Sequence, residues 1–133
     1  MFYPPLMDTT TRRQRLTKHF TFQEMTATST GLPNIPDEYA FNNLLYTCRI
    51  LESVRKQFKH PIPISSGFRS PDVNYHPDVG GSKNSYHLDG RAVDILTSSM
   101  SSTTIDKLES LLWNYNPVEL IRYTTKPIIH VAF

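Results

Sequence analysis

Apolar residues recur at intervals of three and four between Asp37 and about Lys59. This interval is the period of a helix that buries one face, so we predict the main helix of the protein there. Its predicted core-facing residues are Ala40, Leu44, Leu45, Cys48, Leu51, Val54 and Phe58. A second helix is predicted from Thr103 or Thr104 to about Tyr115. Its apolar side holds Ile105, Leu108, Leu111 and Leu112.

Shorter apolar segments predict the strands. They cover residues 61–67, where the strand leads into a turn, and residues 91–96, 118–123 and 128–133. The last two are joined by a turn through Lys126 and Pro127, whereas residues 68–85 form a long irregular stretch. This order of elements predicts an α+β fold in which helices flank a small, mostly antiparallel sheet.

The first residues differ in character from the rest. Residues 1–18 are polar, with two prolines and a threonine run, and predict a loosely ordered N-terminal arm. Thr21 then caps a short predicted helix whose third residue is Glu24. Because 133 residues suit one compact domain, we expect a single domain over residues 19–133.

Composition and charge exclude several classes of partner and site. With 38% hydrophobic and 20% charged residues, the chain is typical of a soluble globular protein. The net charge is only +2, and the basic residues gather only at positions 12–18, so we expect no nucleic-acid partner. One cysteine, Cys48, excludes an internal disulfide and a multi-cysteine metal site. We also expect a monomer.

No apolar run approaches the roughly 20 residues that span a bilayer, so no membrane span is expected. The N-terminal residues lack the order of a secretory signal: a basic start, an apolar middle and a small-residue cleavage site. We therefore expect a product synthesised soluble in the cytoplasm.

The candidate chemistry lies in the second half of the chain. His87 and Asp94 are seven residues apart, with Gly90 able to turn the chain between them, so their side chains can converge. His130 stands in an alternating strand, where an imidazole is more often a core residue than a ligand. Two histidines and one carboxylate, with a fourth position left for water, form a recurring catalytic zinc arrangement. A histidine and an aspartate seven residues apart also occur together by chance.

The letters around these residues carry a resemblance. Residues 66–71 read SGFRSP, residues 85–94 read SYHLDGRAVD, and the chain ends in IIHVAF. These segments resemble the M15 family of zinc D-Ala-D-Ala peptidases, whose pattern is SGYRSP, then SxHxxGxAxD and a late WVHVSF-like strand. Residues 19–25, HFTFQEM, resemble the HFTLxEF start of a phage-associated branch. The resemblance covers residues 19–133.

The resemblance implies a zinc fold like that of the DD-peptidase and hedgehog proteins, and it assigns roles. His87, Asp94 and His130 become the ligands of Zn²⁺. Arg69 becomes the catalytic and substrate-binding group that steadies the carbonyl or carboxylate of the scissile peptide, since a guanidinium offers fixed donors to developing charge. Ser85 matches a serine that contacts substrate, although a turn hydroxyl bonding its own backbone is the alternative.

One expected residue is missing. The family has a glutamate general base in a DQLIxE-like segment, but residues 118–123 read VELIRY. Tyr123 stands where the glutamate is expected, and Glu119 lies about 13 Å away along a strand that rises roughly 3.3 Å per residue. That is too far unless the strand bends or the register differs. Three explanations remain open: Glu119 is the base in a shifted register, Tyr123 or another acid such as Asp89 helps, or the domain binds wall peptide without cleaving it.

From the resemblance we expect a zinc peptidase that hydrolyses bonds in peptidoglycan stem or cross-link peptides, with Glu119 as its base and Tyr123 beside the substrate. The phage-like opening predicts action on the host cell wall as a phage or prophage product. The alternative is a catalytically impaired, zinc-stabilised module that binds wall peptide or a protein partner, and the missing glutamate favours it.

Overall fold

A four-stranded antiparallel sheet lies at the centre of the computed structural model, which describes residues 14–133. The strands lie in the order β3, β4, β6, β5, and their bounds are β3 Ile64–Ser66, β4 Ala92–Leu96, β5 Glu119–Arg122 and β6 Ile128–Ala132. All four fall within segments that the sequence predicts as strands. The α+β class, with antiparallel strands and flanking helices, is confirmed.

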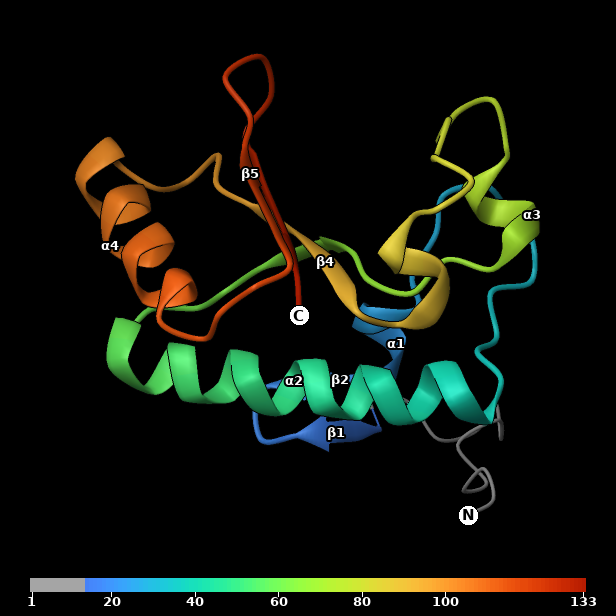
Figure 1. Cartoon of the computed structure of the whole chain (residues 1–133), viewed down its shortest axis with the longest axis horizontal. Helices are drawn as coiled ribbons and strands as arrows, with labels where there is room; N and C mark the ends of the chain where they lie inside the picture. Colours follow the sequence, from blue (N-terminus) through green and yellow to red (C-terminus); the bar gives the residue numbers. More distant parts are fainter. Residues whose placement is uncertain (1–13) are drawn as a thin grey trace.

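The main helix, α2 (Glu38–Phe58), begins and ends within one residue of its predicted bounds. The side chain of Asp37 caps it by accepting a hydrogen bond from the backbone of Ala40, and Lys59 ends it in a left-handed conformation. The helix runs beneath the sheet (Figure 1). The predicted core residues of α2 are buried except Leu45, which is half-buried.

Helix α4 (Ser102–Trp113) stands beside the C-terminal end of α2 (Figure 1). It begins one or two residues before the predicted start because Ser101, rather than a threonine, is its N-cap and accepts a hydrogen bond from the backbone of Thr104. Leu108 and Leu112 are fully buried and join the same hydrophobic core as α2 and the sheet.

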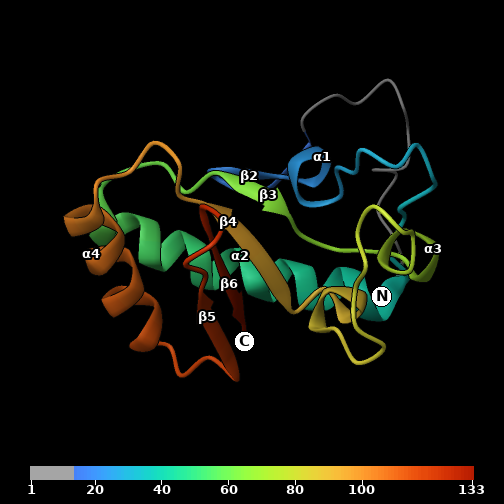
Figure 2. The same ribbon diagram turned by 90° about the horizontal axis from the view of Figure 1, so that it is seen from above.

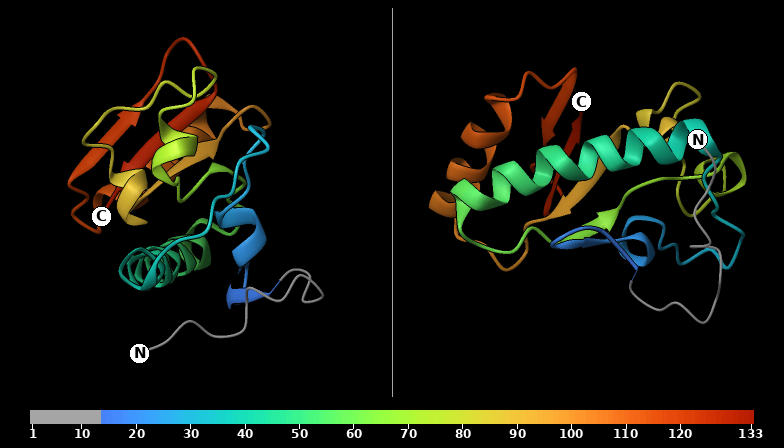
Figure 3. Two further views of the ribbon diagram at one scale, coloured as in Figure 1. Left: turned by 90° about the vertical axis from the view of Figure 1, so that its right-hand side faces the viewer. Right: turned by 90° about the horizontal axis from the view of Figure 1, so that it is seen from below.

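An additional two-stranded sheet lies at the N-terminal end of the described chain. Strand β1 (Arg15–Thr17) pairs with β2 (Phe20–Thr21), and Figure 3 shows this small sheet beside α2. Strand β1 lies within residues 1–18, which were expected to form a loosely ordered arm, and this last part of the arm is therefore ordered. Residues 1–13 lie outside the described residues. Helix α1 (Phe22–Met25) follows, with the predicted capping box of Thr21 and Glu24.

The stretch predicted as irregular, residues 68–85, contains one short helix, and a second short helix follows it. Helix α3 is Pro71–Asn74, and the 3-10 helix η2 is Tyr86–Asp89, which begins just after that stretch. The loop between them is tied back to α3, because the buried Asn74 donates a side-chain hydrogen bond to the carbonyl of Ser82. Seen from above, α3 and α4 lie at opposite ends of the molecule with the sheet between them (Figure 2).

Over residues 14–133, no helix combines the length and the apolar character needed to cross a membrane.

Candidate metal centre

Three predicted ligands meet in the structure. His87, Asp94 and His130 each offer one ligand atom, and these atoms lie within 4.8 Å of one another. Asp94 and His130 are direct partners across β4 and β6, and directly opposed residues hold their side chains close together. His87 comes from η2, whose end at Gly90 turns the chain into β4. The sheet register and one turn therefore assemble the group.

The turn at Gly90 is fixed against α2. Gly90 has a φ of 74°, and a Cβ at this position would lie 2.3 Å from the backbone oxygen of Ala40. The hydroxyl of Thr47 donates to the carbonyl of Gly90 at 2.9 Å, and the amide of Asn43 donates to the carbonyl of Asp89 at 3.0 Å. The main helix thus determines how η2 meets β4, and so how far His87 stands from the residues of that strand.

Hydrogen bonds fix the orientation of both imidazoles. Nδ1 of His87 lies 2.6 Å from the carbonyl oxygen of Gly67. A carbonyl only accepts, so Nδ1 carries the hydrogen, and Nε2 faces Oδ1 of Asp94 at 3.2 Å. In His130 the nitrogens are reversed: Nδ1 lies 2.9 Å from the same Oδ1, and Nε2 lies 2.5 Å from Oε1 of Glu119. Each ring therefore presents one nitrogen to the centre and anchors the other.

The second oxygen of Asp94 is held by Arg69. Nη2 of Arg69 donates to Oδ2 of Asp94 at 3.0 Å, and Nε donates to the hydroxyl of Ser66 at 3.0 Å. Arg69 thus orients a candidate ligand, a contact that the sequence did not predict. Its predicted contact with substrate stays a prediction.

Electrostatics favour a charged centre. Burial raises the pKa of Asp94, but hydrogen bonds and charge from His130 and His87 outweigh it and hold that pKa well below its usual value. Burial lowers the pKa of His130, yet the hydrogen bonds to Asp94 and Glu119 raise it above its usual value. Burial also lowers the pKa of Arg69, and the charge of Asp94 offsets this effect only in part. Asp94 is therefore an anion at neutral pH, as a cation ligand must be.

A cavity of about 300 Å³ opens over these residues. Its lining residues are Arg69, Val79, Gly80, Gly81, Ser82, Asn84, Ser85, His87, Asp94, Glu119, Ile121, Tyr123, Lys126 and His130. Every predicted site residue, from Arg69 to His130, lines this cavity. Asp89, the alternative acid, does not line it. The structure thus gathers the predicted site into one place.

Ser85 shows both of its proposed features. It caps η2, because its hydroxyl accepts a hydrogen bond from the backbone N–H of His87 at 3.2 Å. This is the turn role that the sequence left open as the alternative. Ser85 also lines the cavity, so a contact with substrate stays a prediction.

The register of β5 and β6 corrects the distance argument for Glu119. Ile121 is the direct partner of His130, so Glu119 and Tyr123 lie two residues to either side of that pair and share its face. Both residues are diagonal neighbours of His130, within reach of a long side chain. The value of about 13 Å is the distance between positions 119 and 123 along the β5 segment. Whether either side chain reaches His130 depends instead on how β5 pairs with β6. The carboxylate of Glu119 accordingly contacts His130.

Sequence reasoning missed Asn34, which holds the segment around Arg69. Its amide nitrogen donates to the carbonyl of Phe68 at 2.9 Å, and its oxygen accepts from the backbone N–H of Ser70 at 2.6 Å. Asn34 is buried, with 8% of its surface exposed. It lies in a loop rich in serine, threonine, glycine and proline, and no local pattern indicates a partner 36 residues away.

The donor set suits a zinc ion. Two imidazole nitrogens and one carboxylate oxygen are the protein ligands of several catalytic zinc sites, which keep a further position open. Hydrogen-bonded partners behind each ligand are typical of such sites, and here they are Gly67, Arg69 and Glu119. The residues present therefore fit the metal.

A small α+β domain whose His–Asp–His group, with both histidines buried, lines an open cavity has the features of a metal-dependent hydrolase. The sequence model of the peptidase M15 family matches residues 18–132, so the chain belongs to this family. It is a family of metallopeptidases, which implies peptidase activity and a peptide substrate. No curated protein matches the chain.

Proposed function

We propose that the protein is a zinc-dependent peptidase that hydrolyses peptide bonds in peptidoglycan stem or cross-link peptides. The observation that carries the proposal is the meeting of three ligand atoms within 4.8 Å at the floor of the cavity. A cavity of about 300 Å³ is at the lower end of the range for small-molecule sites, which suits a short peptide segment.

The proposed zinc ligands are Nε2 of His87, the carboxylate of Asp94 and Nδ1 of His130. When bound, the ion supplies a Lewis acid that polarises a carbonyl and lowers the pKa of water. Arg69 steadies the carbonyl oxygen of the scissile bond. A guanidinium has five N–H donors and only two are used by Asp94 and Ser66, so donors remain for the substrate.

Glu119 is the proposed general base. It accepts a proton from the attacking water and returns it to the leaving amine. Among the described residues that line the cavity, Asp94 is the only other carboxylate, and hydrogen bonds already engage both of its oxygens. Glu119 uses one oxygen to hold His130. Ser85 and Tyr123 line the same cavity and are the proposed substrate contacts.

The setting is inferred from the opening residues 19–25, which resemble a phage-associated branch of the family. We infer action on a host cell wall as a phage or prophage product. A second candidate function is binding of wall peptide without cleavage. Tyr123 favours it, because this residue stands where the family pattern has the glutamate base.

One experiment separates these functions. Bound zinc and the release of amines from isolated peptidoglycan are measured on the same purified samples of wild type, His87→Ala and Glu119→Gln. Glutamine keeps a side-chain oxygen for His130 but takes up no proton, so this variant should retain zinc and lose release. Glu109→Gln is the matched control, because Glu109 pairs with Arg122 and does not line the cavity.

Stoichiometric zinc in wild type, with release lost in both site variants, supports the peptidase and Glu119 as base. Zinc in wild type without any release indicates the binding module. Absence of zinc from wild type, or unchanged zinc in His87→Ala, overturns the metal site. Full release by Glu119→Gln overturns the role of Glu119 alone.

A further inference from the structure

Lys126 lies at the mouth of the candidate site and has no role in the proposed chemistry. It belongs to the turn between β5 and β6, which extends beyond the rest of the sheet on one side of the molecule (Figure 1). Lys126 lines the cavity together with Gly80, Gly81 and Ser82 from the loop that follows α3. A cation therefore stands where a bound peptide would enter.

The ammonium group of Lys126 has a defined place. Nζ lies 4.3 Å from the centroid of the Tyr123 ring, within the range of a cation–π interaction. This contact holds the ammonium over a residue that also lines the cavity. A carboxylate at the position of Tyr123 would neutralise the lysine, whereas an aromatic ring leaves its charge available.

The other charged groups of the cavity are already engaged. Arg69 is paired with Asp94 at 3.0 Å, and Glu119 is bonded to His130. Over residues 14–133, no carboxylate lies within 4.0 Å of Lys126. Of the two described lysine and arginine residues that line the cavity, Arg69 is paired with a carboxylate and Lys126 is not.

We propose that Lys126 is a specificity-determining residue that binds a free carboxylate of the substrate peptide. This inference rests on the proposed function and deepens it. The ammonium has three donors, and the phenol of Tyr123 supplies a further one, so a carboxylate in the cavity has two neighbouring donor groups. The substrate class is a peptide with a free carboxylate close to the scissile bond, either a terminal α-carboxylate or an acidic side chain.

The test measures binding, so it needs no turnover. The affinity of the full zinc-loaded chain for L-Ala-D-Glu-L-Lys-D-Ala is measured by calorimetry, at low salt and under conditions where no cleavage is detected. Two probes separate the sources of the carboxylate: the same peptide with a C-terminal amide, and the peptide with D-Gln in place of D-Glu. The series is repeated without zinc, because the lysine contact does not involve the metal.

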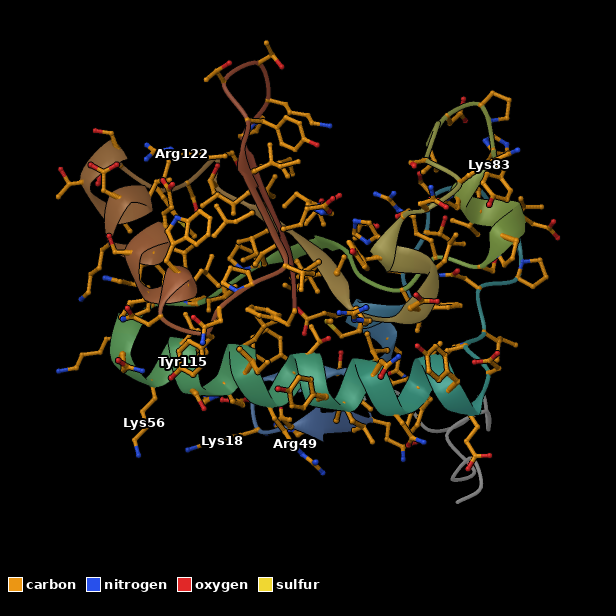
Figure 4. All side chains as sticks on the ribbon, in the orientation of Figure 1. Lys18, Arg49, Lys56, Lys83, Tyr115 and Arg122 are labelled. Carbon is orange, nitrogen blue, oxygen red and sulfur yellow. The ribbon has the colours of Figure 1, made fainter. Side chains whose placement is uncertain are left out.

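The variants are Lys126→Met, which keeps the aliphatic stem, and Lys126→Arg, which keeps the charge. Lys83→Met is the control for net charge, because Lys83 extends from the loop after α3 and does not line the cavity (Figure 4). Wild type should bind the free acid about two- to fivefold more tightly than one of the two neutralised probes, as expected for an ion pair made by the exposed Lys126. Lys126→Met should lose this preference, while the other two variants keep it.

Equal affinity of wild type for all three probes would overturn the proposal, and so would a preference that survives in Lys126→Met. The latter outcome would assign the carboxylate to Arg69. Failure of the proposed function is a separate result: an acid preference without release of amines from peptidoglycan leaves Lys126 with its role and removes only the peptidase.

Discussion

Nε2 of His130 lies 2.5 Å from a carboxylate oxygen of Glu119, while Nδ1 of the same ring faces Asp94. The two residues come from neighbouring strands, two positions out of direct register. The contact places a carboxylate behind a candidate ligand, as Gly67 stands behind His87 and Arg69 behind Asp94. All three candidate ligands are therefore oriented by the protein itself.

Replacement of Gly90 by alanine should destabilise the protein strongly. The backbone has a φ of 74°, and the new Cβ would lie 2.3 Å from the oxygen of Ala40. We expect a loss of about 3 kcal/mol in the free energy of unfolding, from strained φ and overpacking together. Gly31 is the matched control: its φ is 76° but nothing lies within 4 Å of the added Cβ, so Gly31→Ala should cost about 1 kcal/mol. Urea denaturation measures the unfolding free energy of both variants. Equal losses would show that the close approach of Gly90 to Ala40 adds nothing to the cost.

Asn34→Ala should loosen the segment that carries Arg69. The change leaves the N–H of Ser70 and the carbonyl of Phe68 without their side-chain partner. We expect a loss of about 2 kcal/mol in the free energy of unfolding, and faster hydrogen exchange at the backbone N–H of Ser70. Asn42→Ala, on the exposed side of α2, is the control and should change stability by less than about 0.5 kcal/mol. Unchanged exchange at Ser70 would argue against the support role of Asn34.

Glu52 should stabilise the docking of the β1–β2 sheet in a pH-dependent way. Burial raises its pKa, but hydrogen bonds from His19 and Thr17 outweigh it, and the net pKa is below its usual value. A depressed carboxyl pKa contributes stability above its unfolded value, near 4.3, and this contribution is lost as the pH falls through the folded value. Glu52→Gln should thus cost about 1 kcal/mol at pH 7 and less at pH 3.

The difference in unfolding free energy between wild type and Glu52→Gln, measured at both pH values, checks the sign. Other carboxylates, Asp94 included, titrate equally in both proteins and cancel in this difference. A cost that is larger at pH 3 than at pH 7 would contradict the assignment.

Cys48 should be unreactive in the folded protein. The side chain is fully buried, and burial, with the charges of Glu24 and Glu52, raises the pKa of its thiol to about 12. Because the thiolate is the reactive form, alkylation at pH 8 should occur only after unfolding. Mass spectrometry of samples alkylated in increasing urea should follow the unfolding curve. Rapid modification without urea would show that the core opens locally around α2.

Much of the local structure follows from the sequence alone. The spacing of apolar residues in α2, the capping box of Thr21 and Glu24, and the strands at the end of the chain depend on neighbours a few residues away. The three candidate ligands were likewise predicted from the resemblance to the M15 family, because each lies within a short segment that matches the family pattern. These are properties that a single segment carries by itself.

The tertiary structure decided the rest. Pairing of β4 with β6 places Asp94 opposite His130, and pairing of β5 with β6 brings Glu119 to the same imidazole. The contact of Arg69 with Asp94 and the β1–β2 sheet also depend on residues distant in the chain. Register is set by which strands pack together and how the core fills, so spacing along one strand could not predict it.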